Sequence, residues 1–217
     1  MPDPIDLTDF VAKVRVFLSD LTHNNDRDWF RENKSLYDAD LKRPAERILA
    51  DIAPALEARS GAPVRTKLFR PHRDIRFSED KTPFHTHLHM LWSLQDGRGW
   101  YFGLSTEYAT AGAGIMAFDA EQLGAYRDAL DGPEGENLDA CLRTIGGRMD
   151  PPTLKRVPQP YPADHPRGEL LRRKGLVMWR DGIEAQLSPD PVTGLMAAFD
   201  DLQPVQDWLG RCVADQS

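Results

Sequence analysis

The spacing of apolar residues changes along the chain, and this change constrains the fold more than any other feature of the sequence. From Leu7 to about Gly61 the apolar residues recur every three or four positions, which is the period of an amphipathic helix. Between residues 66 and 118 they alternate in short runs, and Pro- and Gly-containing turns separate these runs. The pattern predicts N-terminal helices followed by a β-meander.

Local signals place some of the helix ends. Asp26 is a predicted N-cap for a short helix that carries Trp29 and Phe30. Pro44 is typical of a first helical turn, and Gly61 is typical of the residue that ends a helix, so a longer helix is predicted between them.

The remaining elements follow from the same two periods. Strands are predicted at 66–77, 84–94, 99–107, 112–118 and 176–183, and further helices at 123–130, 138–145, 166–174 and about 204–213. Short links between strands favour antiparallel neighbours. The predicted fold class is α+β, an antiparallel β-meander sheet packed by N-terminal, middle and C-terminal helices. A chain of 217 residues can bury one core, so residues 1–217 are predicted to form a single domain.

Charge and composition limit the possible partners. There is no secretory leader and no apolar run of about 18 residues, so a cytoplasmic protein without a membrane segment is expected. The net charge of −7 argues against a general nucleic-acid binder. Residues 65–81 nevertheless carry six basic and three acidic side chains, and residues 155–174 carry six and two. If these stretches meet, they form a positive site suited to a small anion.

The first of these stretches contains the main candidate site. Arginine and lysine are the side chains that recognise phosphate and carboxylate groups, so four residues are predicted to contact an anionic ligand: Arg70, Arg73, Arg76 and Lys81. Asp74 would orient an arginine or act as an acid/base group. The alternative is an ion-pair network in which Asp74, Glu79 and Asp80 neutralise these bases and stabilise a turn.

The alternation of a strand makes a separate prediction for residues 68–77. It places Arg70, His72, Asp74 and Arg76 on one face and Arg73 among apolar positions on the other. A guanidinium there requires either an acidic partner or a pocket.

Histidines follow directly in the sequence. Alternation places His85, His87 and His89 on one strand face, opposite Phe84, Leu88 and Met90. Two histidines two positions apart can chelate a divalent ion, but no further metal signature accompanies them. We therefore predict no metal site, with His85 and His87 as the residues that would form one.

A third candidate is Asp164 with His165. Such a pair can act in acid/base catalysis, or it can cap a helix that begins at Pro166. The sequence identifies no cofactor.

These charged and aromatic residues resemble a bacterial family known as domain of unknown function 2461. The resemblance rests on a motif of Arg70, Arg73, Asp74, Arg76, Phe77, Asp80, Lys81 and Phe84, and on two flanking segments, 24–37 and 154–166. Phe84 stands where the family usually has tyrosine. The resemblance implies that four of these residues, Arg73, Asp74, Arg76 and Lys81, belong to a family feature, and it implies no activity.

Three functional hypotheses follow. The first is a small-molecule site for an anionic, possibly phosphorylated, ligand. The second is a noncatalytic structural or protein-interaction domain, which a fully paired Arg73 and Asp74 without an open cleft would favour. The third is a nucleic-acid-associated phosphodiester hydrolase, which a continuous basic groove would favour. Whether the chain is an enzyme, and in what oligomeric state, is left open by the sequence.

Overall fold

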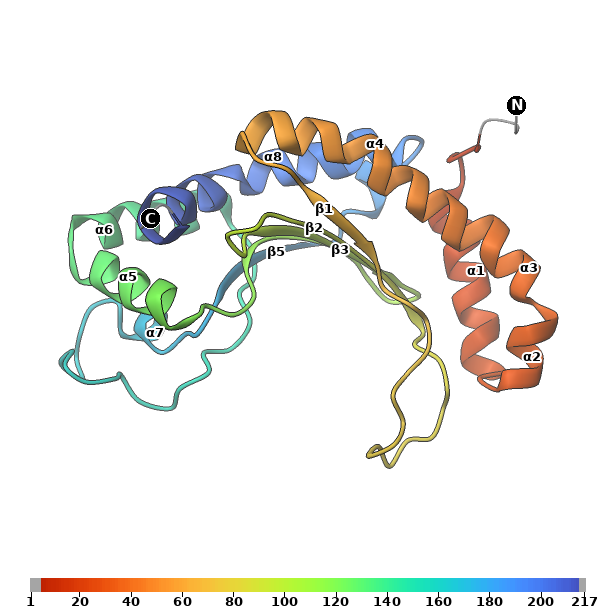
Figure 1. Cartoon of the computed structure of the whole chain (residues 1–217), viewed down its shortest axis with the longest axis horizontal. Helices are drawn as coiled ribbons and strands as arrows, with labels where there is room; N and C mark the ends of the chain where they lie inside the picture. The colour runs from red at the N-terminus through yellow and green to blue at the C-terminus, as the bar shows by residue number, and fades with distance from the viewer. Residues whose placement is uncertain (1–4, 215–217) are drawn as a thin grey trace. The chain divides into compact units, whose positions relative to one another are not determined.

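The computed structural model describes residues 5–214 and has the predicted α+β architecture (Figure 1). The α-helices are α1 (Phe10–His23), α2 (Arg27–Glu32), α3 (Lys34–Leu36), α4 (Arg43–Ser60), α5 (Ala120–Asp131), α6 (Pro133–Ile145), α7 (Gly168–Leu171) and α8 (Pro191–Leu209). The strands are β1 (Arg65–Leu68), β2 (His87–Ser93), β3 (Gly99–Ser105), β4 (Ala109–Ile115) and β5 (Leu176–Asp181). Short π-helical or 3₁₀ segments are η1 (Tyr37–Lys42), η2 (Glu184–Leu187) and η3 (Gly210–Ala214).

The five strands form one antiparallel sheet in the order β1-β2-β3-β4-β5, which confirms the predicted meander. Every strand is therefore hydrogen-bonded to its neighbour in sequence, and β1 lies at an edge. None of the helices between residues 5 and 214 has both the length and the apolar character that crossing a bilayer requires.

Contacts divide the chain into two compact units that alternate along the sequence. Unit 1 holds the residues up to Trp92 together with Tyr101–Ala111 and Asp181–Ala198. Unit 2 holds Ser93–Trp100, Gly112–Arg180 and the residues from Phe199 onward. The basic stretch 65–81 belongs to unit 1 and the stretch 155–174 to unit 2. Their meeting, like the single domain, stays a prediction.

In unit 1, helix α4 packs against the first strands of the sheet (Figure 1). The indole of Trp92 on β2 donates to the carbonyl of Leu49 on α4 at 3.0 Å. The predicted ends of α4 are confirmed, because Pro44 lies in its first turn and Gly61 follows it with a left-handed φ of 68°. Asp26 also caps α2 as predicted, since its carboxylate accepts from two backbone N–H groups.

Unit 2 has its own apolar core. Its largest fully buried side chains include Trp100, Tyr126 and Trp208. The Tyr126 hydroxyl donates to Leu170 O at 3.2 Å, and the Trp208 indole donates to Glu134 O at 2.9 Å. These two bonds connect α5 to α7 and α8 to α6, so the helices of this unit are held by polar as well as apolar contacts.

Several predicted boundaries are wrong. The predicted strand 66–77 ends at Leu68, and the helix predicted at 166–174 is the single turn α7. The last helix starts at Pro191 rather than near Pro204, and Pro204 lies inside it. The strand predicted at 112–118 lies at 109–115 instead.

Candidate functional site

Residues 69–86 leave the sheet after β1 and return as β2, and we call this segment the arm (Figure 1, yellow loop). The two sides of the arm pair near its base through an antiparallel bridge between His72 and Phe84. Pro71 and Pro83 supply only carbonyls there, which accept from His85 N–H at 2.7 Å and Arg73 N–H at 2.8 Å respectively. Two prolines without N–H groups limit the pairing to this bridge, so the strand predicted through residue 77 does not form.

Side chains from α2 and the turn before it hold the returning side of the arm. Asn25 Nδ2 donates to Phe84 O at 2.9 Å, and Phe84 N–H donates to Asn25 Oδ1 at 3.1 Å. The ring of Phe84 stacks on Phe30 with 4.1 Å between centroids, and His72 packs edge-on against Phe84 at 5.0 Å. The base of the arm is thereby fixed to the N-terminal helices.

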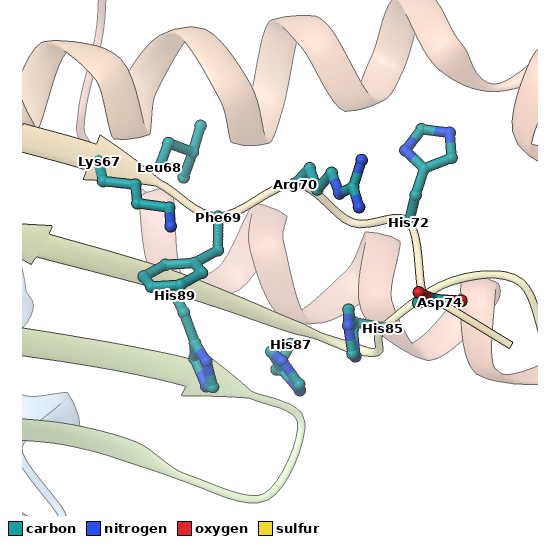
Figure 2. A pocket seen from close by; sticks show the side chains of 9 residues that line it. All are labelled: Lys67, Leu68, Phe69, Arg70, His72, Asp74, His85, His87 and His89. Carbon is teal, nitrogen blue, oxygen red and sulfur yellow. The ribbon is translucent and has the colours of Figure 1, made fainter. Parts of the chain in front are cut away.

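A cavity of about 460 Å³ opens between the start of the arm and β2 (Figure 2). Nine residues line it: Lys67, Leu68, Phe69, Arg70, His72, Asp74, His85, His87 and His89. All of them belong to unit 1. The volume lies within the range of about 300–1,000 Å³ that is typical of small-molecule sites.

Three imidazoles form one wall of the cavity, and we call His85, His87 and His89 the histidine ladder. In Figure 2 they project from β2 and the residues before it in a row toward the same side. The ring centroids of His85 and His87 are 4.7 Å apart, and those of His87 and His89 are 3.9 Å apart in a stacked arrangement. The predicted alternation is confirmed here, because Leu88 and Met90 are buried in the core on the opposite face.

The ladder favours neutral imidazoles. Burial, with the neighbouring His89 and His85, lowers the pKa of His87 to about 4. Burial also lowers the pKa of His85 and His89, with smaller effects from Arg73 on the former and from His85 on the latter. A neutral imidazole has one N–H donor and one acceptor nitrogen, so the ladder presents both kinds of group.

The hydroxyl of Tyr108, in the turn between β3 and β4, lies at one end of the ladder. Nε2 of His89 lies 2.9 Å from the Tyr108 hydroxyl, and burial raises the pKa of that phenol. Both rings lie over Gly103 on β3, where an added Cβ would meet Tyr108 at 3.1 Å and His89 at 3.2 Å. The missing side chain at Gly103 therefore provides the space for this contact.

Two cations line the same cavity as the ladder, Lys67 on β1 and Arg70 at the start of the arm. Lys67 Nζ lies 4.4 Å above the ring of Phe69, a cation–π contact. Among residues 5–214, neither Lys67 nor Arg70 has a carboxylate within 4.0 Å. Arg70 is the only member of the predicted anion-binding set that lines the cavity within this part of the chain.

The other predicted cations are engaged within the arm. Arg73 Nη1 pairs with Asp80, donates to Thr82 Oγ1 and has a side chain that is 22% exposed. Lys81 Nζ donates to Ile75 O at 3.1 Å. Arg73 therefore has the acidic partner that its position required, and it stabilises the arm.

Asp74 is held by the last of the predicted arginines. Arg76 Nη2 lies 2.6 Å from Asp74 Oδ2, and both side chains are exposed. The hydrogen bond from Arg76 lowers the pKa of Asp74, so this carboxylate is negatively charged at neutral pH. Asp74 lines the cavity and Arg76 does not.

The candidates Asp164 and His165 lie in unit 2. His165 Nδ1 accepts from Arg167 N–H at 3.0 Å, which makes Nε2 the protonated nitrogen, and Nε2 lies 3.2 Å from Asp131 Oδ1. Both ring nitrogens are engaged in positioning this segment. The capping prediction is wrong, because α7 begins at Gly168 after Arg167 and no side chain caps it. An acid/base role for Asp164 or His165 stays a prediction.

The possible metal ligands do not form a cluster in the described part of the chain. Between residues 5 and 214, no group of three or more His, Cys, Asp or Glu side chains is placed to hold a metal ion. His85 and His87 line the cavity as neighbouring rings.

Sequence reasoning missed part of the cavity wall. It named neither Lys67 nor Phe69 as a site residue, and it gave His72 and His89 no ligand role. The alternation that grouped His89 with His85 and His87 was the available signal. No local sequence pattern identifies Phe69 and Lys67 as site residues, because their position in the cavity wall depends on the path of the arm.

Fold and site together define an α+β protein with a cationic, histidine-lined cavity beside the edge strand of an antiparallel sheet. The chain belongs to the family described as conserved hypothetical protein DUF2461, whose model matches residues 13–208. This match confirms the resemblance drawn from the sequence. No curated protein and no solved structure matches the chain.

Proposed function

We propose that this protein binds a small anionic ligand, such as a phosphorylated compound, in the cavity between the arm and β2. The observation that carries the proposal is that Lys67 and Arg70 line the cavity without an ion-pair partner within 4.0 Å among residues 5–214. Charge-assisted hydrogen bonds to an oxyanion would satisfy both cations. Neutral imidazoles of the ladder would add N–H donors to the same anion.

The ion pairs within the arm support different roles for its paired arginines and for the unpaired cations of the cavity. Arg73 with Asp80, and Arg76 with Asp74, form the ion-pair network that the structural alternative requires. That alternative also requires the absence of an open cleft, whereas a cavity of about 460 Å³ lies beside these pairs. We therefore assign Arg73 and Asp80 to the scaffold of the arm, and Arg70 and Lys67 to the ligand.

Thermal unfolding with a panel of anions tests the proposal. The panel holds inorganic phosphate, pyrophosphate, sugar phosphates, nucleotides and small carboxylates, all at one ionic strength because salt screens exposed charges. A ligand at 100 times its Kd stabilises the folded state by about 2.7 kcal/mol. For a chain of this size that corresponds to a Tm increase of about 5–10 °C.

A pair of arginine variants locates the site. Arg70→Gln should weaken binding about 10- to 150-fold, which corresponds to the loss of one charge-assisted contact of about 1.5–3 kcal/mol. Arg31→Gln is the matched control, because Arg31 is exposed on α2, away from the cavity, and pairs with Asp28 on the same helix. An equal loss in both variants, or a panel without any Tm shift, would exclude the cavity as an anion site.

A further inference from the structure

Aromatic rings form much of the cavity wall, beside the unpaired cations and across from them. Phe69 and the three imidazoles of the histidine ladder contribute these rings, while Lys67 and Arg70 contribute the charge. A lone oxyanion would contact the cations and leave the ring surface in water. The volume of about 460 Å³ instead suits an organic molecule with an apolar part.

The geometry of these rings favours edge-to-face contacts with a ligand. Centroid separations of 4.7 Å and 3.9 Å, with interplanar angles of 32° and 18°, show that the imidazoles pack face to face on one another, so the ladder presents mainly ring edges to the cavity. Phe69 stands edge-on to His89 at 86° with 6.4 Å between centroids. Edge-to-face geometry is favourable for aromatic pairs, so the ring edges of the ladder suit contact with the face of a ligand ring.

Phe69 is also unusually exposed for a residue beside a cavity. Its relative exposure is 40%, and Lys67 Nζ sits over the ring. In Figure 2 the phenyl ring lies beside His89, whereas Leu68 points the other way. Proteins that bind single-stranded nucleic acids combine basic side chains that contact the phosphates with aromatic rings on which the bases stack.

We propose that the ligand is an organic anion that carries a planar aromatic ring, as a nucleoside monophosphate does. The anionic group lies at Arg70 and Lys67, and the ring packs against Phe69 and the histidine ladder. This inference rests on the proposed function, since it names the class of ligand for the same cavity.

Matched pairs of ligands separate the ring from the anion. Calorimetry compares AMP with ribose 5-phosphate, and phenyl phosphate with methyl phosphate, at constant pH and ionic strength. Each pair shares its phosphate group and differs in the ring. The ring-bearing member should bind at least tenfold more tightly, a difference of about 1.4 kcal/mol.

Two phenylalanine variants test where the ring binds. Phe69→Leu keeps an apolar side chain but removes the aromatic face, and it should reduce the preference for the ring-bearing member to less than threefold. Phe77→Leu is the matched control, because Phe77 lies in the same arm, is 97% exposed and does not line the cavity. The control should keep the preference of the native protein.

The outcomes distinguish the two proposals. If ribose 5-phosphate and methyl phosphate bind as tightly as their partners, and Arg70→Gln weakens all four, the ring inference is overturned and the anion site stands. A ring preference that survives Phe69→Leu also overturns the placement at Phe69. If none of the four compounds binds, the ring inference falls, and the full anion panel decides whether the cavity is an anion site.

Discussion

Asn25 holds Phe84 by both of its backbone polar groups, through hydrogen bonds of 2.9 and 3.1 Å. Phe84 is 4% exposed, so water cannot readily replace these bonds. A single side chain thus attaches the returning side of the arm to the N-terminal helices. Because His85 is the next residue, the same contact sets the position of the histidine ladder.

Loss of the contact between Asn25 and Phe84 should lower the stability of the protein. We expect Asn25→Ala to lower the free energy of unfolding by about 2–4 kcal/mol, because two buried backbone groups lose their partner. Chemical denaturation measures the change. Asn24→Ala is the control, since Asn24 is exposed and its side chain donates to Asp20 O within the same helix end, and it should change stability by less than about 0.5 kcal/mol. Equal effects of the two variants would contradict this account.

Acid should destabilise the protein through the histidine ladder. The folded pKa of His87 is about 4, whereas the unfolded value is about 6.5, so the unfolded chain binds more protons between these values. Stability is then full above about pH 6.5 and falls as the pH decreases toward 4. We expect Tm to decrease between pH 7.5 and 5 in the native protein, and to decrease less in His87→Gln.

A histidine outside the cavity controls for this result. His23 is exposed at the end of α1, and its ring contacts Ser19 O. His23→Gln should show the same dependence of Tm on pH as the native protein. Parallel curves for the native protein and His87→Gln would show that the ladder does not cause the acid sensitivity.

Asp80 should stabilise the arm in a lower pH range. Hydrogen bonds from Thr82 and Arg73 lower the pKa of Asp80 to about 2. Its contribution is therefore present above about pH 3.8 and is lost as the pH falls through about 2. At pH 7 we expect Asp80→Asn to accelerate proteolysis within the arm, because Arg73 loses its carboxylate partner. Glu79→Gln, an equal charge change at an exposed neighbour, should leave the cleavage rate unchanged.

Gly103 should affect ligand binding because it has no side chain to crowd the rings beside the cavity. An alanine Cβ would lie 3.2 Å from His89 and 3.1 Å from Tyr108, so these rings must move. We expect Gly103→Ala to weaken binding of any anion that shifts Tm. Gly124→Ala is the control: its Cβ meets nothing within 4 Å, and it should stabilise α5 by about 0.5–1 kcal/mol without changing affinity. Unchanged affinity in Gly103→Ala would remove His89 from the site.

The site could be predicted in part. Strand alternation grouped His85, His87 and His89 on one face because that period is a local property of the backbone. The residues that contact the anion were harder to predict from the sequence. Of the four cations predicted for the ligand, Arg70 lines the cavity, whereas Arg73 pairs with Asp80. The pairing depends on the path of the arm, which two prolines turn away from the strand that the pattern predicted.

By itself, the sequence determined the kinds of elements and their antiparallel order. The local signals are the spacing of the apolar residues, helix-end residues such as Asp26 and Gly61, and short links between strands. Each of them acts over a few residues. Only the tertiary structure decided which charges are free. Residues 65–81 hold six basic and three acidic side chains, and many pairings among them have similar energies. The folded path of the arm selects one set of pairs, and it leaves Lys67 and Arg70 lining the same cavity as the histidine ladder.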